Sequence, residues 1–232
     1  MKSIGIIGGF GGYATLDFFR RLLKKFEGES ERSFPHIIMD NDFQMPSRTK
    51  AILTGEGYEE IVKAIADSIK RMLYCEVDYI ILVCGNAHNF LPDVYDIVPQ
   101  AKEKVISLPE IVGLFLQQKN KKRVLVLASE GSLLKHLYSN VLKKYGIQCI
   151  EPGISEFNNL RYFIEIVKNN QDNDGKEFVK YIAEYEINDV ILGCTEFPVL
   201  INSVKDKKSI PFEIYDPLEI LLDYLKLHVK LS

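Results

Sequence analysis

The stretch SIGIIGGFGGYATLDFFRRLLKKF, residues 3–26, decides the fold, because its plan occurs twice in the chain. It contains an apolar run typical of a buried strand, a glycine-rich turn, and then apolar residues at helical spacing. Residues 123–146, RVLVLASEGSLLKHLYSNVLKKYG, repeat this order, with Gly131 in place of Gly11 and Tyr138 in place of Phe18. The repeat predicts two similar lobes related by pseudo-symmetry.

Each half also carries another helix followed by a strand that ends in a cysteine. The helices are predicted over residues 58–74 and 176–185, and the strands are DYIILVC, ending at Cys84, and DVILGC, ending at Cys194. Helices that alternate with short apolar strands are typical of parallel sheets covered on both faces. We therefore expect an α/β fold of two lobes, each a mostly parallel sheet flanked by helices. The expected boundaries are residues 1–103 plus 213–232 for the first lobe and 104–212 for the second.

The composition indicates a globular protein that acts on a small molecule. The 232 residues are 47% hydrophobic, and 29 Lys+Arg are balanced by 32 Asp+Glu along the chain. The basic patches at residues 119–123 and 205–208 are too short for a nucleic-acid interface. There is no membrane-length apolar run, and the first residues meet glycine too early for a signal peptide. We expect a cytoplasmic protein with a small-molecule partner, no nucleic acid and no membrane.

The four cysteines are too few for a disulfide framework, and none forms a CxxC pair suited to zinc. Cys75 ends a helix and Cys149 lies in the strand GIQCIEP, so we predict structural roles for both. Cys84 and Cys194 end equivalent strands and precede polar residues. A single cysteine at such a position is usually a core residue. Because ligands collect beyond the carboxyl ends of parallel strands, the pair instead predicts two thiols facing one cleft between the lobes.

Four motifs in order resemble the cofactor-independent aspartate/glutamate racemases. They are IGIIGGFGG, MPSRT, CGNAH and GCTE, and Asp216 in IYDPLEI is similar to the aspartate before the last helix of that family. Glutamate racemases usually open with Asp-Ser-Gly and carry His after the second Cys-Thr, whereas this chain has Gly-Gly-Phe and Glu196, so it resembles the aspartate branch. The resemblance implies no cofactor and a homodimer. The GGFGG turn also lacks the spacing of a nucleotide phosphate loop.

Two cysteines suit the reaction that this resemblance implies. Inverting an α-carbon without a cofactor requires a base on one face of the carbon and an acid on the other. A thiolate and a thiol serve both directions if their roles swap. The resemblance makes Cys84 and Cys194 this catalytic pair, with hydrogen-bond donors stabilising the enediolate that develops at the substrate carboxylate.

The resemblance also assigns the residues that bind the amino-acid substrate. Arg48 would grip a side-chain carboxylate, which a guanidinium can do bidentately, and Lys168 would assist unless it is an ordinary exposed lysine. His88 either tunes Cys84 or is a hydrogen-bonded structural histidine, the second being favoured. Glu196 and Asp216 would either orient other groups of the site or bridge the two lobes. The other substrate-binding candidates are Gly9, Gly11, Gly85, Asn86, Ser129, Gly131, Ser132 and Thr195.

The chain departs from the family pattern beside the first cysteine. Gly85 and Asn86 stand where the family has Asn-Thr, and Gly12 stands where Pro is common. We therefore expect weak activity on aspartate or a preference for another amino acid. We also expect the double change Gly85→Asn with Asn86→Thr to raise aspartate racemisation.

Two other functions remain open. A related dicarboxylate isomerase or decarboxylase is one, since a fold shared with such enzymes does not fix the reaction. A non-catalytic binding protein that kept the cleft is the other, and the presence of both thiols argues against it.

Overall fold

The computed structural model describes residues 2–28 and 30–229. The chain divides into two compact units, Met1–Leu108 with Leu221–Ser232 and Pro109–Ile220, which we call the first and second lobes. Each lobe contains a parallel sheet flanked by helices. The two-lobed α/β class predicted from the sequence is therefore confirmed.

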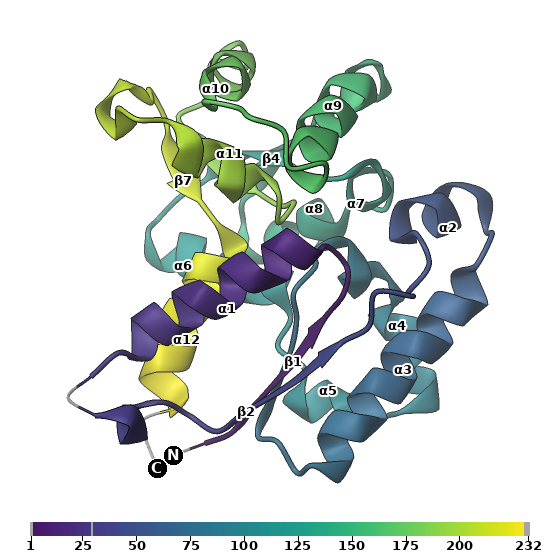
Figure 1. The fold of residues 1–232 in the computed structure, drawn as a ribbon. Coiled ribbons are helices and arrows are strands. Elements are labelled where there is room, and N and C mark those ends of the chain that lie inside the picture. Colours follow the sequence, from purple (N-terminus) through teal and green to yellow (C-terminus); the bar gives the residue numbers. More distant parts are fainter. Residues whose placement is uncertain (1, 29, 230–232) are drawn as a thin grey trace. The chain divides into compact units, whose positions relative to one another are not determined.

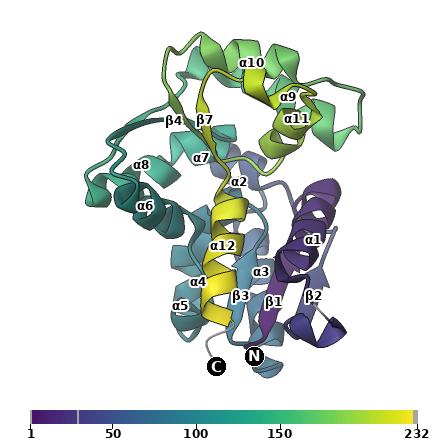
Figure 2. The same cartoon turned by 90° about the vertical axis from the view of Figure 1, so that its left-hand side faces the viewer.

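The sheet of the first lobe has three parallel strands in the order β2-β1-β3, of which β1 and β2 are labelled in Figure 1 and all three in Figure 2. They are β1 (Ile4–Gly8), β2 (Ile37–Asn41) and β3 (Tyr79–Leu82). All five residues of β1 are buried, because it lies between the other two strands. This explains why its sequence is a continuous apolar run instead of an alternating one.

Helices cover both faces of the first sheet. A Cβ on Gly5 would lie 2.8 Å from the Met72 sulfur, so α3 (Tyr58–Tyr74) packs closely on one face. A Cβ on Gly8 would lie 2.6 Å from Cγ2 of Thr15, which places α1 (Gly12–Phe26) on the other. The same side carries α12 (Pro217–Val229), bound to α1 by a Lys25–Asp223 ion pair of 2.5 Å (Figure 2). The shorter helices of this lobe are η1 (Glu31–Ser33), α2 (Arg48–Thr54), η2 (Asn86–Phe90), α4 (Leu91–Ile97) and α5 (Ala101–Lys104).

The sheet of the second lobe has four parallel strands in the order β5-β4-β6-β7. They are β4 (Arg123–Leu127), β5 (Gln148–Ile150), β6 (Asp189–Leu192) and β7 (Glu213–Tyr215). Strand β4 lies between β5 and β6, as β1 lies between β2 and β3. The repeat seen in the sequence is therefore also a repeat of topology.

Aromatic rings hold the helices on one face of the second sheet together. Ring centroids are 4.9 Å apart for both Phe163–Phe178 and Phe178–Phe197, which joins α9 (Phe157–Lys168), α10 (Lys176–Ala183) and α11 (Phe197–Ser203). The other helices are α6 (Leu108–Gln118), η3 (Lys143–Tyr145), η4 (Ile154–Glu156) and η5 (Lys207–Ser209), with α7 and α8 described next. Every helix within the described residues is too short or too polar to cross a bilayer.

The helix after β4 is broken, unlike its counterpart α1. It consists of α7 (Glu130–Leu134) and α8 (Leu137–Leu142), separated at His136, whose φ is +50°. His136 Nδ1 lies 2.6 Å from Glu151, just beyond β5. The break is thus accompanied by a contact with a distant segment, which the local apolar pattern does not indicate.

Candidate active site

Cys84 and Cys194 occupy equivalent places in the two lobes. Each thiol lies two residues beyond a strand, Cys84 after β3 and Cys194 after β6. Strand β3 pairs with β1, and β6 pairs with β4, the repeated first strand. Both residues are partly exposed and neither forms a disulfide. Each lobe therefore carries one accessible thiol at the edge of the sheet where parallel α/β proteins bind ligands.

The glycine turn after β1 is held tightly against the loop that follows β2. Gly9 has a φ of +83°, and a Cβ there would lie 2.1 Å from the carbonyl oxygen of Asp42. Gly11 precedes α1, and its carbonyl accepts hydrogen bonds from both the amide and the hydroxyl of Thr15, each 3.0 Å long. Only glycine fits at position 9, since a side chain would meet both steric strain and backbone.

Arg48 joins this turn to the next loop. Its Nη1 donates to the carbonyl of Pro46 at 2.9 Å, and its Nη2 donates to the carbonyl of Phe10. The guanidinium also lies over the Phe10 ring, 5.1 Å from its centroid. The guanidinium of Arg48, the first residue of α2, thus lies beside the glycine turn, and part of its donor capacity is used by the main chain.

Asn86 is buried and its side-chain amide has partners at both ends. Its nitrogen donates to the Thr49 hydroxyl at 3.1 Å, and its oxygen accepts from the Asn89 side chain at 2.9 Å. Gly85, just before it, has helical angles, with φ −56° and ψ −47°. The Asn86 side chain therefore ties the segment after Cys84 to α2.

His88 is a structural residue that holds the main chain of Cys84. Its ring is fully buried, and burial lowers the pKa of the imidazole, so the ring is neutral near pH 7. The amide of Leu108 donates to Nε2 at 3.3 Å, so the proton is on Nδ1, which donates to the carbonyl of Cys84 at 3.0 Å. Of the two roles open from the sequence, the geometry supports the structural one.

Burial of His88 makes stability depend on pH. In the unfolded state the His88 imidazole titrates near its ordinary pKa of 6.5, and in the folded state its pKa is lower. The contribution of the neutral ring to stability is therefore complete above pH 6.5 and is lost as the pH falls below it. Below that value, we expect the unfolding free energy to fall by up to about 1.4 kcal/mol per pH unit from this group. Urea unfolding at several pH values gives the unfolding free energy as a function of pH. The slope of this free energy against pH should be smaller for His88→Gln, while exposed His36→Gln keeps the wild-type slope. Equal slopes in all three proteins would contradict this role.

In the second lobe, the turn after β4 is buried and polar. Ser129 precedes α7, and its hydroxyl lies 3.4 Å from that of Ser132, with Gly131 between them in the first turn. Glu130 is also buried, and its carboxylate forms a 2.5 Å ion pair with Arg161 of α9. The predicted residues 129, 131 and 132 are therefore together in one turn.

The segment after β6 carries the second thiol and an acidic partner. Glu196 is only 5% exposed, and its Oε2 accepts hydrogen bonds from the Cys194 thiol at 3.0 Å and from the Thr195 hydroxyl at 3.1 Å. A Cβ on Gly193 would lie 2.8 Å from the ring of Tyr138, which explains the glycine before Cys194. Cys194, Thr195 and Glu196 thus form a connected polar cluster.

The contacts described for Lys168 and Asp216 include neighbours within their own segments. Lys168 is exposed at the last residue of α9, with Nζ 3.5 Å from Glu165. Arg161, which pairs with Glu130 beside the Ser129 turn, lies about 10 Å nearer the start of the helix. Asp216 accepts a hydrogen bond of 2.9 Å from the amide of Leu218 at the start of α12.

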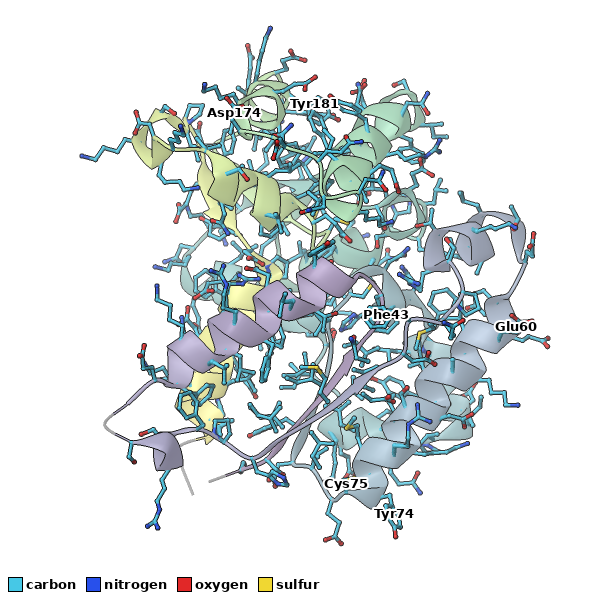
Figure 3. The ribbon with its side chains drawn as sticks, viewed as in Figure 1. Phe43, Glu60, Tyr74, Cys75, Asp174 and Tyr181 are labelled. Atoms are coloured by element: carbon cyan, nitrogen blue, oxygen red, sulfur yellow. The ribbon has the colours of Figure 1, made fainter. Side chains whose placement is uncertain are left out.

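The other two cysteines differ from the strand-end pair. Cys75 is exposed at the end of α3, beside Tyr74 (Figure 3). Cys149 lies in β5, where burial raises the pKa of its thiol to about 11. Neither has the surroundings expected of an acid/base group that works near neutral pH.

Several residues of the polar clusters have no strong sequence signal. Phe10, Thr49 and Asn89 contact predicted site residues through hydrogen bonds or ring packing. Thr49 lies within the MPSRT motif and Asn89 is one residue beyond CGNAH, so proximity to a motif was the available signal. Arg161 is distant from any motif, and its ion pair with Glu130 brings it to this edge.

The fold and the two strand-end thiols define a duplicated α/β protein with a cysteine at the ligand-binding edge of each sheet. The family model for Asp/Glu/hydantoin racemases matches residues 7–225, and the chain belongs to this family.

Known relatives agree with this assignment. Glutamate racemase of Lactobacillus helveticus is 24% identical over 96% of this chain and 79% of its own length. The broad specificity amino-acid racemase RacX of Bacillus subtilis is 26% identical over 63% of each protein. Among solved structures, the Picrophilus torridus aspartate racemase has a TM-score of 0.81 at 24% identity, covering 98% of this chain and 94% of that one. At this identity, the structural likeness concerns the fold.

Proposed function

We propose that the chain is a cofactor-independent amino-acid racemase in which Cys84 and Cys194 are the acid/base pair. The observation that carries the proposal is the equivalent position of the two thiols, each two residues beyond a topologically matched strand in a member of a racemase family. One thiolate takes the α-proton from one face of the substrate, and the other thiol returns a proton to the opposite face. The roles swap for the reverse reaction.

The carbanion formed in this reaction requires stabilisation by donors near the substrate carboxylate. The hydroxyls of Ser129 and Ser132 and the main chain at Gly9, Gly11, Gly131 and Thr195 are the groups that we propose for this task, since the Thr195 hydroxyl donates its proton to Glu196. Gly85 and Asn86 complete the set beside Cys84. The polar turns at the carboxyl ends of β1, β4 and β6 support this proposal, since each supplies main-chain or side-chain donors at that edge of its sheet.

For the substrate, we propose an acidic amino acid, with aspartate favoured and glutamate or a broader range as the alternatives. Arg48 has five N–H donors, which exceeds the three carbonyls of Phe10, Met45 and Pro46 that it contacts, so donors remain for a side-chain carboxylate. Lys168 is the weaker candidate for the same task, because it is exposed beside Glu165. The relatives named for aspartate, glutamate and broad specificity support the class of substrate. We further propose a cytoplasmic homodimer, following the family resemblance.

Incubation with single enantiomers in deuterated water tests the proposal. A panel of L- and D-amino acids that includes aspartate and glutamate is followed by chiral chromatography and mass spectrometry. We expect inversion accompanied by deuterium at the α-carbon for at least one acidic amino acid. Loss of CO₂ from the substrate would instead indicate a decarboxylase. Tight binding without exchange would indicate a binding protein, and either result would overturn the racemase proposal.

A pH profile provides a second check. The substrate-ready enzyme must hold one thiolate and one thiol, so kcat/KM should rise and then fall with pH as the coupled pair titrates. Initial racemisation rates between about pH 6 and about pH 10 provide the measurement. A flat profile over that range would count against the two-thiol mechanism.

The departure at Gly85 yields a prediction on specificity. The helical backbone angles of Gly85 suit any residue, so Gly85→Asn restores the amide of the family pattern without strain. The single substitution keeps Asn86 bonded to Thr49 and Asn89, which the double change would not. One recovered hydrogen bond should raise kcat/KM for aspartate about tenfold. An unchanged or lower value, with unaltered stability, would show that the native turn already suits aspartate.

A further inference from the structure

The thiol of Cys194 has an acidic partner that is fixed in place. The Cys194 sulfur lies 3.0 Å from Oε2 of Glu196, and the Thr195 hydroxyl donates to the same oxygen at 3.1 Å. Glu196 is 5% exposed, so little water screens its carboxylate. Glu196 also immediately precedes α11, whose packing through Phe197 on Phe178 limits its movement.

The proton shared by this pair belongs on sulfur. A cysteine thiol ordinarily loses its proton near about pH 8.5, whereas a carboxyl group does so near about pH 4.3. Ionising the thiol would leave two negative charges about 3 Å apart in a poorly screened position. The hydrogen bond therefore favours a thiol at position 194 and a carboxylate at position 196.

We propose that Glu196 is a positioning residue that keeps Cys194 protonated in the resting enzyme, so that Cys84 is the thiolate that a substrate meets first. This inference rests on the proposed racemase function for its catalytic meaning, but the protonation of Cys194 can be measured without turnover. Once Cys84 has taken an α-proton, Cys194 donates its own proton to the opposite face of the carbanion. Cys194 is then left as a thiolate beside Glu196, and the repulsion favours return to the resting form.

Among the described residues, other acidic side chains at this edge of the second sheet include Glu130, Glu151 and Asp216. Beyond β4, Glu130 is neutralised by Arg161 at 2.5 Å, and beyond β5, Glu151 is paired with His136 at 2.6 Å. Asp216, beyond β7, adds another acidic side chain at the start of α12. Tyr138, another titratable residue at this edge, packs its ring against Gly193, the residue before Cys194. Of the acidic groups named here, Glu196 is the one whose hydrogen bond to the Cys194 sulfur carries the proposal.

The difference in protonation between Cys84 and Cys194 cannot appear in kcat/KM. The equilibrium constant between two enantiomers is one, so kcat/KM must be equal for the two directions of racemisation. Site-resolved alkylation reveals the difference in protonation directly, since iodoacetamide reacts with the thiolate. Rates at Cys84 and Cys194 are measured by peptide mass spectrometry across pH, in the wild type and in Glu196→Gln. The pH midpoint of each rate reports ionisation independently of how accessible the sulfur is.

We expect the Cys194 midpoint to lie at least one pH unit above that of Cys84, which is a tenfold difference in thiolate at neutral pH. Glu196→Gln should lower the Cys194 midpoint by at least one unit, while Glu196→Asp, which keeps the charge, moves it less. Exposed Glu184→Gln makes the same change in net charge and should leave both midpoints unaltered. Slow alkylation of Cys149, whose thiol pKa is raised by burial to about 11, checks that each variant is folded.

A Cys194 midpoint at or below that of Cys84, or one unmoved in folded Glu196→Gln, would overturn the inference. The proposed function fails separately. If no amino acid exchanges its α-proton but the midpoints behave as expected, the role of Glu196 stands and the racemase proposal does not. If racemisation occurs and the two midpoints coincide, the racemase proposal stands and the role of Glu196 does not.

Discussion

Replacing either Cys84 or Cys194 with serine should lower the racemisation rate by on the order of a thousandfold, because general acid/base catalysis contributes about that factor. A serine hydroxyl retains the size and position of the thiol but does not ionise near neutral pH. Each variant therefore lacks either the base or the acid in both directions. Chiral chromatography of product from each enantiomer measures the loss.

The matched control is Cys75→Ser, because Cys75 is exposed at the end of α3 and lies outside the strand-end pair. Its rate should equal that of the wild type. Urea unfolding of all three variants separates lost chemistry from lost structure. Wild-type activity in either folded Cys84→Ser or folded Cys194→Ser would refute the assignment of the acid/base pair.

The second large effect is expected on stability, from Gly9→Ala in the turn after β1. Gly9 has a φ of +83°, and the new Cβ would lie 2.1 Å from the carbonyl oxygen of Asp42. The left-handed conformation alone costs roughly 1–2 kcal/mol for an L-residue. The backbone of Asp42 must also move, so we expect a total loss of about 3 kcal/mol or more in the free energy of unfolding.

Gly55→Ala is the matched control for this substitution. Gly55 has a similar φ of +78°, but a Cβ there would have no heavy atom within 4 Å. Its cost should be only that of the left-handed conformation, roughly 1–2 kcal/mol. Urea unfolding of both variants measures the difference, and equal losses would show that the Asp42 contact contributes nothing.

The sequence was sufficient for the elements whose apolar pattern is strong and local. The helix predicted over residues 58–74 is present as α3, and the strands after Asp78 and Asp189 are β3 and β6. These elements are buried on the faces that their periodicity indicates. The equivalent positions of Cys84 and Cys194 followed from the repeat, since both copies keep the same order of strands.

The features that could not be predicted depend on contacts between distant segments. The break between α7 and α8 lies at His136, which contacts Glu151, whereas the local sequence pattern indicates one helix. The bond from Arg48 to the carbonyl of Phe10 joins residues far apart in the chain. Periodicity and motif order contain no information about such pairings, so these partners appear only in the folded chain.

The bond between Cys194 and Glu196 is a different case, because the two residues are near neighbours. The motif GCTE shows that a carboxylate follows the cysteine, but a side chain two positions on can point toward the thiol or away from it. Burial of Glu196 before α11 selects the first arrangement. The sequence thus identified the residue as a site candidate, and the structure identified what it contacts.

The central claim is that two thiols act from opposite faces of one carbon. Deuterium incorporation during early turnover tests this claim most directly. In deuterated water, a single enantiomer of the best substrate is stopped at low conversion, and both enantiomers are separated and analysed for deuterium at the α-carbon. The two-thiol account predicts a fully deuterated product and an unlabelled remaining substrate, because the base that takes the proton does not return it to the same face. Deuterium in the remaining substrate at the same rate as in the product would indicate a single base and contradict the account.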